Sequence, residues 1–323
     1  MTAKLIAVAN MKGGVGKSAT VISLAEALAA VSIRPGRGGA IGQDSVLVID
    51  LDAQASASYA LAGDETLKTL IEGGKTLDVY LGGLHGIGSR SRLKDFVRPT
   101  VSSVTHFDHP LNIALLASCP GLRHAEKKLV HTLTANNRSL ADIEALVFDS
   151  IRADLEGLKE EYAYIIFDCP PGISFLTEVA IRVSDLVIVP TIPDFLSVLG
   201  LDAFVQNLWP ELAGPGGPLP PPPHRPHVLI TKRRGIRGHA NMVIRLRDRT
   251  LGRYQQESQI AQRIRERPYQ LFEVEVPETG EFSRALERTG TAPTFKQRWG
   301  TVLSTTLERL VAEVRERLLN PCH

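Results

Sequence analysis

Short apolar runs alternate with stretches of helical composition along most of the chain. Several of the runs are almost entirely apolar and rich in β-branched residues, which is typical of strands covered on both faces, as in a parallel sheet. The runs predict strands at residues 5–9, 46–49, 112–116, 164–167, 186–189, 228–230 and 272–276. The helical stretches between them can supply the crossovers that parallel strands need. The pattern therefore predicts an α/β fold, a doubly wound, mostly parallel sheet with helices on both faces.

Signals for helices are clearest at three places. Residues 18–30 have helical composition directly after the first strand, and Ser139 with Asp142 is typical of a helix start. Near the C-terminus, apolar residues recur at helical spacing, namely Val302, Leu303, Leu307, Leu310, Val311, Val314 and Leu318. Acidic residues balance the arginines of this last stretch, whereas membrane-surface helices favour a basic polar face. We therefore expect the last helix to pack on the sheet, with membrane binding as the alternative.

Three stretches interrupt the alternation and look like insertions. Residues 34–43 are rich in glycine, residues 63–110 are weakly patterned, and residues 214–226 contain four consecutive prolines. A proline run can be neither a helix nor a central strand, so we interpret the third stretch as a stiff extended loop. Because strands are expected on both sides of every insertion, we predict one P-loop domain over residues 1–323. A separate second domain is compatible with the length.

Composition narrows the classes of protein to which the chain can belong. The 323 residues are 43% hydrophobic and 22% charged, as in a globular protein with a real core. The three cysteines form no C-x-x-C pair, which argues against disulfides and a zinc site and favours a reduced compartment. The N-terminus carries no secretory signal, and no apolar run approaches the roughly 18 to 20 residues that span a bilayer. We therefore expect a cytoplasmic protein that is not an integral membrane protein.

A glycine-rich run follows the first predicted strand and ends in Gly16-Lys17-Ser18. This ending matches the P-loop pattern G-x-x-x-x-G-K-[ST], although Met11 occupies the position of the first glycine. Glycines let backbone N–H groups approach phosphates, and the positive end of the following helix attracts them. We expect Lys17 to reach the β- and γ-phosphates of ATP and Ser18 to place its hydroxyl on Mg²⁺. The residues expected to bind the nucleotide are Lys12, Gly13, Gly14, Val15, Gly16, Lys17, Ser18 and Ala19.

Carboxylates follow two of the predicted strands, where they can meet this loop. Asp50 and Asp52 end the second strand, and a carboxylate at such a position can accept a hydrogen bond from water. Asp168 follows apolar residues 164–167, which is the Walker B pattern that holds Mg²⁺ directly or through water. We therefore expect Ser18, Asp50 and Asp168 at the metal. The plain alternative for Asp50 and Asp52 is a solvated strand end.

A second lysine, Lys12, directly precedes the glycines of the phosphate loop. The form K-G-G-x-G-K-[ST] resembles the deviant Walker A motif of the ParA/MinD family of P-loop ATPases. Residues 46–56 resemble the D-x-D-P-Q segment of that family, with Ala53 in place of the proline, and residues 164–172 resemble its second switch. The resemblance spans most of the chain apart from the three insertions. It is closest to the ParA-like partition ATPases that lack an N-terminal helix-turn-helix domain.

The resemblance implies an ATPase whose chemistry depends on a dimer. Family members form a sandwich dimer with ATP and dissolve it by hydrolysis. Lys12 matches the lysine that reaches the partner's nucleotide, and Asp52 matches the carboxylate that orients the attacking water. The catalytic residues are therefore expected to be Lys12, Lys17 and Asp52. ParA-like members bind DNA non-specifically as ATP dimers, and a ParB-like partner protein releases them by stimulating hydrolysis.

Residues 232–267 bear on whether the protein binds DNA or a membrane. They contain eleven basic and three acidic residues, a net charge of +8, whereas the whole chain carries +2. Such asymmetry suits a phosphate backbone, and the position roughly matches the DNA-contacting region of ParA-like proteins. We expect DNA contacts from Lys232, Arg233, Arg234, Arg237, Arg245 and Arg247. Solvated helix faces are the plain alternative.

Two functions of different classes remain open. The first is a ParA-like ATPase that partitions plasmids or chromosomes, or positions cargo, on the nucleoid. The second is a MinD-like membrane- or complex-associated regulatory ATPase in cell division or polysaccharide secretion. The D-x-D-x-Q segment disfavours a metabolic ligase similar to dethiobiotin synthetases. We expect the ParA-like function, with ATP and Mg²⁺ as cofactors, a homodimer in the ATP state, non-specific DNA as a partner, and little membrane binding.

Overall fold

A parallel sheet forms the centre of the computed structural model, which describes residues 2–33, 43–84, 91–209, 219–250, 269–286 and 293–320. Within these ranges, seven strands form this sheet in the order β5-β2-β6-β1-β7-β8-β9, with every neighbouring pair parallel. The strands are β1 (Lys4–Val8), β2 (Val46–Asp50), β5 (Ile113–Leu116), β6 (Tyr164–Asp168), β7 (Leu186–Thr191), β8 (His227–Arg233) and β9 (Gln270–Pro277). Each overlaps a run that the sequence predicts to be a strand. The predicted fold class is therefore confirmed.

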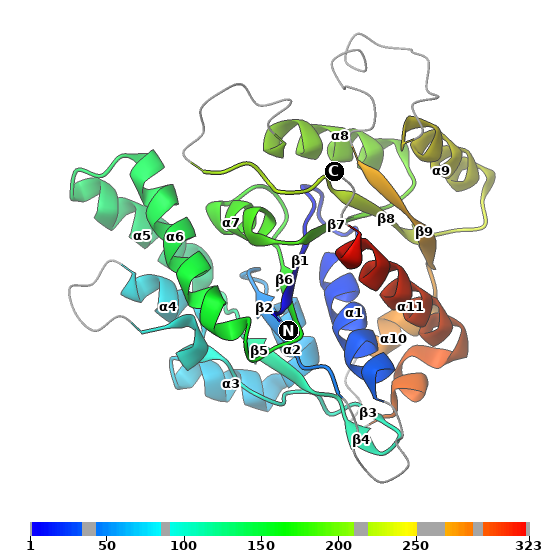
Figure 1. Cartoon of the computed structure of the whole chain (residues 1–323), viewed down its shortest axis with the longest axis horizontal. Coiled ribbons are helices and arrows are strands. Elements are labelled where there is room, and N and C mark those ends of the chain that lie inside the picture. The colour runs from blue at the N-terminus through cyan, green and yellow to red at the C-terminus, as the bar shows by residue number, and fades with distance from the viewer. Residues whose placement is uncertain are drawn as a thin grey trace.

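Helices cover both faces of this sheet (Figure 1). One face carries α4 (Leu77–Gly83), α5 (Leu122–Ala135), α6 (Leu140–Leu158), α7 (Phe175–Val183), α8 (Phe195–Leu208) and α9 (Arg237–Thr250). The other face carries α1 (Lys17–Ser32), α2 (Ser56–Ala62), α3 (Asp64–Glu72), α10 (Gly280–Leu286) and α11 (Phe295–Leu319). Side chains alternate along β1, so that Leu5 and Ala7 join the first core and Ile6 and Val8 the second. This two-sided burial explains why the strands are apolar throughout.

The helix boundaries follow local chemistry. Ser139 begins α6 with a reciprocal capping box, because its hydroxyl accepts from the Asp142 N–H at 3.1 Å and the Asp142 carboxylate accepts from the Ser139 N–H at 3.1 Å. At the other end of the chain, α11 packs against α1. The Trp299 indole donates to the buried Glu26 carboxylate at 2.7 Å and so joins the two helices. No helix in the described ranges is long and apolar enough to cross a membrane.

The stretch at residues 63–110 is more ordered than its weak pattern suggests. It contains α3, α4, a 3₁₀ helix (Leu93–Phe96) and a small hairpin of β3 (Thr105–His106) and β4 (His109–Pro110). The pattern is weak because the stretch is built of short elements, each of which turns only a few residues toward the core. In α3, for example, only Leu67 and Leu70 are buried.

The other two proposed insertions are described only in part. Residues 219–226 contain neither helix nor strand, as expected for the proline-rich loop, and Leu219, Pro222 and Pro226 are buried in it. Residues 34–42 and 210–218 lie outside the described residues. The extent of the insertions and the single domain therefore stay predictions.

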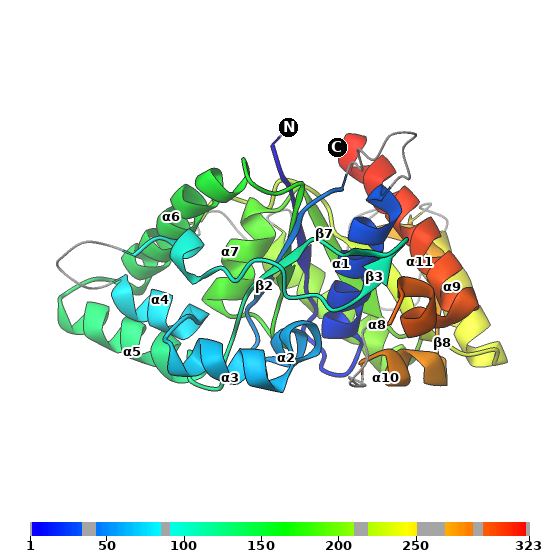
Figure 2. The ribbon, with the colours of Figure 1, turned by 90° about the horizontal axis from the view of Figure 1, so that it is seen from below.

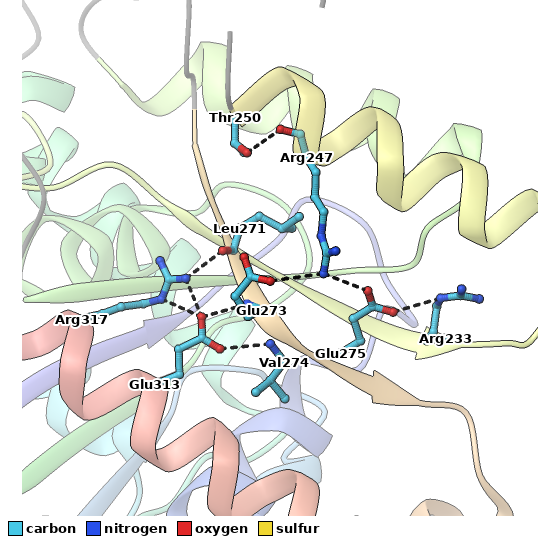
Figure 3. Close-up of polar contacts among 9 residues, drawn as sticks. All are labelled: Arg233, Arg247, Thr250, Leu271, Glu273, Val274, Glu275, Glu313 and Arg317. Carbon is cyan, nitrogen blue, oxygen red and sulfur yellow. Dashed lines mark hydrogen bonds and ion pairs between the residues drawn. The ribbon is translucent and has the colours of Figure 1, made fainter. Parts of the chain in front are cut away.

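The outer edge of β9 is covered by side chains of α11. The Glu313 carboxylate accepts hydrogen bonds from the backbone N–H groups of Glu273 at 2.8 Å and Val274 at 3.1 Å (Figure 3). Arg317 holds this carboxylate through an ion pair at 2.6 Å and donates to the Leu271 carbonyl at 2.8 Å. Between Leu271 and Val274, backbone groups that an edge strand would offer to another chain are thus already occupied.

The opposite edge, β5, is covered by backbone from the stretch at residues 63–110. Arg98 and Leu115 exchange backbone hydrogen bonds at 2.8 and 2.9 Å, and the Val101 N–H donates to the Ile113 carbonyl at 2.8 Å. The sheet therefore has a covered edge on each side.

Candidate functional site

The loop between β1 and α1 is shaped by its glycines. Gly14 and Gly16 have φ angles of 75° and 92°, in the left-handed region that other residues rarely adopt. Gly16 is the last residue before α1, so the free N–H groups at the start of that helix face the loop. Figure 2 shows α2 and α10 at the end of the sheet where α1 begins. This arrangement of N–H groups suits an anion such as phosphate.

Two side chains fix the loop to neighbouring strands. Asn10 donates to the Pro190 carbonyl at 2.8 Å and accepts from the Lys12 N–H at 2.9 Å. The Thr231 hydroxyl donates to the Val15 carbonyl at 2.8 Å. The sequence does not single out Asn10 or Thr231, because Pro190 and Val15, to which they donate, are about 180 and 216 positions away. Both residues make the loop rigid before any ligand is bound.

Lys17 lies almost entirely inside the protein, with 7% of its surface exposed. Its ammonium donates to the Lys12 carbonyl at 3.0 Å. Burial lowers the pKa of Lys17, while the nearby carboxylates of Asp168 and Asp52 act in the opposite direction. The predicted phosphate-binding lysine is therefore buried beside carboxylates at the phosphate loop.

Asp50 and Asp168 are neighbours in the sheet, because β2 and β6 pair in the register that places one opposite the other. Both are fully buried. The Asp50 carboxylate accepts three hydrogen bonds, from the Ser58 hydroxyl at 2.7 Å, the Ser58 N–H at 2.9 Å and the Asp52 N–H at 3.0 Å. Burial raises the pKa of Asp50 to about 6, although these hydrogen bonds favour its charged form. Asp50 thus organises the turn after β2.

Asp168 differs from Asp50 in having neither carboxylate oxygen in a hydrogen bond. Burial, and then the charge of Asp50, raise the pKa of Asp168 well above its usual range. The Ser18 side chain lies close enough to favour the charged form, yet it makes no hydrogen bond of ordinary geometry. A buried carboxylate with two unpartnered oxygens beside a hydroxyl fits a divalent cation.

A magnesium ion would have few protein ligands here. No group of three or more His, Cys, Asp or Glu side chains in the described part of the chain is arranged to hold a metal. Magnesium commonly binds through one or two carboxylates together with substrate phosphates and water. The residues of the predicted metal set that fit best are Ser18 and Asp168, since the oxygens of Asp50 are already engaged.

A cavity of about 440 Å³ opens beside the phosphate loop. Asp52 lines it together with Lys17 and Ser18, and the Asp52 carboxylate accepts from the Gln54 N–H at 3.0 Å. Asp52 is not a solvated strand end, because only 6% of its surface is exposed. The structure therefore brings two predicted catalytic residues, Lys17 and Asp52, to one cavity.

The far end of the cavity was not predicted. It is lined by residues from the ends of β8 and β9 and from α10, including Lys232, Pro277, Glu278, Thr279, Phe282 and Leu286. The Thr279 hydroxyl is buried without a hydrogen-bond partner among the described residues. An apolar wall with a few polar groups suits a nucleotide base. The only sequence signal was the apolar run of β9, which does not show that its end reaches the phosphate loop.

Lys12, the third predicted catalytic residue, points elsewhere. Its ammonium donates to the Ser197 hydroxyl at 2.8 Å and lies 3.6 Å from the Asp194 carboxylate, at the start of α8. Lys12 is not among the residues that line the cavity. It therefore does not reach a nucleotide in its own cavity in this conformation.

The basic segment is divided between paired and unpaired cations. Arg233 forms an ion pair with Glu275 at 3.1 Å, and Arg247 lies 3.4 Å from Glu273 and 3.5 Å from Glu275 (Figure 3). Arg234 pairs with Glu278. These glutamates belong to β9 and the residue after it, outside the segment that the sequence marks as basic. Three of the six predicted DNA contacts are therefore partly neutralised within the chain.

The other three predicted contacts are exposed. In the described ranges Lys232, Arg237 and Arg245 form no ion pair, and the side chains of Arg237 and Arg245 extend from α9, whose Val243 and Leu246 are buried. Of the other arginines of the segment, Arg249 forms an ion pair with Asp202 at 3.0 Å, whereas Arg253, Arg263, Arg265 and Arg267 lie outside the described residues.

Comparison with protein families identifies the N-terminal two thirds of the chain. A family model described as an AAA domain, AAA_31, matches residues 3–209. Soj, the sporulation initiation inhibitor protein of Bacillus subtilis, is 27% identical over 205 residues, which is 64% of this chain and 64% of Soj. The chromosome partitioning protein ParA of Myxococcus xanthus is 28% identical over 216 residues, which is 65% of this chain and 62% of ParA. The chain thus matches less than two thirds of the length of these relatives.

Solved structures share the fold over nearly the whole chain. The structure of pNOB8 ParA bound to nonspecific DNA has a TM-score of 0.65 at 18% identity, covering 98% of this chain and 99% of that one. Cobyrinic acid a,c-diamide synthase from Mycobacterium smegmatis, with bound ATP analog and magnesium, has a TM-score of 0.61 at 18% identity, covering 98% of this chain and 96% of that one. At these identities the likeness concerns the fold alone.

Proposed function

Because the chain belongs to the ParA-like family of P-loop ATPases, we propose that it binds MgATP, pairs with a second copy and binds DNA non-specifically in that state. ATP hydrolysis ends the cycle, and a ParB-like partner stimulates it. The cycle would partition plasmids or chromosomes, or position another cargo. One observation carries the proposal, namely that Lys17, Ser18 and Asp52 line one cavity beside Asp168.

The phosphate end of the cavity supports the binding of a nucleoside triphosphate. The N–H groups of the loop and the buried Lys17 ammonium offset phosphate charge. Ser18 and Asp168 would hold magnesium, which neutralises charge on the phosphates when it is bound. The oxygens of Asp168 would then gain the partner that they lack within the protein. Adenine would occupy the end formed by Pro277, Thr279 and Phe282.

The position of Asp52 supports hydrolysis. Its carboxylate lines the cavity and is held by the Gln54 N–H, so that one oxygen is fixed and the carboxylate can orient a water toward the γ-phosphate. Positioning and charge stabilisation account for most of catalysis in phosphoryl transfer. Lys12 would add its charge from the second copy, since it faces away from its own cavity.

The exposed cations support DNA as the surface that is bound. Lys232, Arg237 and Arg245 are exposed and form no ion pair with a carboxylate of the described residues. A dimer would present two such sets, so pairing would double the number of phosphate contacts and raise the affinity. The related fold of pNOB8 ParA was solved with nonspecific DNA, which supports the same class of partner.

A single experiment tests the cycle. The protein is titrated into a labelled duplex of arbitrary sequence with no nucleotide, with ADP, and with a non-hydrolysable ATP analogue, while ATPase activity is followed in parallel. We expect a mobility shift only with the ATP analogue, and loss of both the shift and hydrolysis in Lys12→Ala, which should still bind nucleotide. Sedimentation with anionic liposomes in place of DNA would instead establish the MinD-like function. Absence of nucleotide binding would contradict both.

A further inference from the structure

Four consecutive prolines, Pro220 to Pro223, lie shortly before β8 and have no part in the proposed function. A proline ring holds φ at about −65°, and a residue that precedes a proline is kept out of the helical region. Residues 219–222 each precede a proline, so the run is held in the extended polyproline II conformation, with about three residues per turn. The backbone shape of this segment therefore follows from its composition.

Burial along the run follows the same three-residue period. Leu219 and Pro222, three positions apart, are buried. Pro220 and Pro223, also three positions apart, are exposed, and so is Pro221. One edge of the polyproline II helix therefore packs against the protein, and the other two edges face outward. We call Pro220, Pro221 and Pro223 the proline ridge.

Backbone contacts hold the segment in place at three points. Arg182 of α7 donates to the Pro220 carbonyl, and the Trp209 indole N–H donates to the His224 carbonyl at 2.7 Å. A backbone N–H at the start of β9 donates to the Pro226 carbonyl at 2.9 Å. These contacts use carbonyl groups and leave the exposed proline rings uncovered. Binding a segment that is already ordered costs little conformational entropy, so the ridge suits recognition by a partner.

A run of prolines can be recognised in few ways. Residues that lack a backbone N–H cannot complete the hydrogen bonds of a partner's strand, and they do not fit a helix. The ridge instead offers flat apolar rings together with the carbonyls of Pro221 and Pro223, which accept no hydrogen bond from the described residues. Grooves lined by aromatic side chains bind such a segment, because the proline rings pack against the aromatic rings and indole or hydroxyl groups can donate to the carbonyls.

A second copy of this chain is a poor occupant for the ridge. In the part of the chain that the structure describes, the exposed aromatic side chains are Tyr59, Phe107 and Phe195. They belong to three separate elements, namely α2, the turn between β3 and β4, and α8. Both tryptophans, Trp209 and Trp299, are buried. A proline-binding groove is therefore expected on another protein.

We propose that the proline ridge is a docking site for another protein, one that carries an aromatic-lined, proline-binding groove. The ridge lies at the end of the sheet where the strands begin, because Pro226 directly precedes β8. The phosphate loop follows the end of β1, and all strands of the sheet run in the same direction, so the loop lies at the opposite end. The ridge also shares no residue with the nucleotide cavity. Docking would thus leave the cavity open, and it does not depend on the proposed function.

The test titrates the whole protein into an isotopically labelled SH3 domain and an isotopically labelled WW domain, both of which bind proline-rich segments through aromatic grooves. NMR shifts of the groove residues measure binding, and poly-L-proline serves as the positive control and as the competitor. We expect at least one domain to bind the wild type and poly-L-proline to displace it. Pro220→Ala combined with Pro223→Ala removes one edge of the ridge but keeps the carbonyl that Arg182 contacts. This ridge variant is expected to bind about tenfold more weakly, or less.

Pro99→Ala combined with Pro110→Ala is the matched control, because both prolines are exposed but each stands alone in the sequence. Its binding should equal that of the wild type. Circular dichroism and titration with a fluorescent ATP analogue should show that both double variants fold and bind nucleotide like the wild type.

Three results would overturn the docking site. The first is equal binding by the ridge variant and the wild type, or an equal loss in the control, which would place the contact elsewhere. The second is absence of binding by domains that do bind poly-L-proline, which would show that the ridge is not accessible. The third is self-association of the wild type in sedimentation velocity that the ridge variant loses, which would make a second copy the occupant.

Discussion

The phosphate end of the cavity and the basic surface of α9 differ in how far their charged side chains are exposed to water. Lys17 is 7% exposed and Asp168 is fully buried, without a partner for either oxygen. Arg237 and Arg245 are exposed, and Arg233 and Arg247 share carboxylates on β9. Buried charges interact strongly because water does not screen them, whereas exposed charges are screened and contribute little one at a time.

The difference determines how each region responds to change. At the phosphate end, removing one side chain leaves another charge buried without compensation, so single substitutions should have large effects. At the basic surface, affinity is the sum of many weak contacts with phosphates, and single substitutions should have small effects that add up.

Asp52→Ala is expected to reduce the rate of ATP hydrolysis about 100- to 1000-fold, because the attacking water loses the carboxylate that orients it. Binding of MgATP should remain, since Lys17, Ser18 and Asp168 are unchanged. Phosphate release under saturating ATP measures the rate, and light scattering should show a dimer that persists with ATP. A rate of hydrolysis equal to that of the wild type would show that Asp52 does not orient the attacking water.

Lys17→Ala is expected to weaken binding of a fluorescent ATP analogue on the order of 100-fold, because it removes a charge-assisted contact in a place with little water. Lys12→Ala is the matched control. The Lys12 ammonium contacts Ser197 of α8 and does not line the cavity, so the nucleotide affinity of this variant should stay within about twofold of that of the wild type. Equal losses in both variants would contradict the distinction between the two lysines.

Reversing the two exposed cations of α9, Arg237→Glu with Arg245→Glu, is expected to weaken binding to all DNA sequences alike, by about tenfold. The slope of log affinity against log salt should become flatter by about 0.9 for each phosphate contact that is lost. Arg152→Glu on α6 provides a control with similar exposure, since its side chain is 61% exposed. Nucleotide binding should not change in either variant. Because the control reverses one charge and the double variant two, a loss of log affinity in the control half as large as in the double variant would show that net charge alone decides binding.

Glu275→Gln is expected to have the smallest effect and the opposite sign. Glu275 contacts both Arg233 and Arg247, so its neutralisation frees positive charge for DNA and should strengthen binding about twofold at low salt (Figure 3). The gain should disappear as salt rises. Weaker binding would mean that the glutamate is needed to position the arginines and does not compete for them.

The two regions also differ in how far the sequence could predict them. The phosphate loop is one contiguous run, and Asp50, Asp52 and Asp168 each follow an apolar run, so the sequence predicts them near the loop. The structure shows how they meet, because β6 pairs with both β1 and β2. The sequence could not show that Ser58, eight residues after Asp50, occupies the oxygens of that carboxylate. It also could not show that α8 holds Lys12, because Ser197 is 185 positions away.

For the basic surface, the sequence identified the arginines but could not show which of them are paired with carboxylates of the same chain. Arg233 and Glu275 are 42 positions apart and meet only because β8 and β9 are neighbours in the sheet. The far end of the cavity, where we place adenine, could not be predicted for a similar reason. Phe282 and Thr279 reach it through the turn after β9, and nothing in a local pattern indicates where that turn leads.

The covered edges of the sheet limit how copies of this protein can assemble. With Glu313 occupying the N–H groups of β9 and Arg98 bonded to β5, no strand from another copy can extend the sheet at these positions. Growth of a continuous-sheet polymer is therefore disfavoured at both edges of the sheet. If the protein gathers in many copies along DNA, as we propose, an open strand edge would seed irreversible association at the high local concentrations reached there. The covered positions of β5 and β9 would then favour contacts between copies through helices and loops, which can separate again.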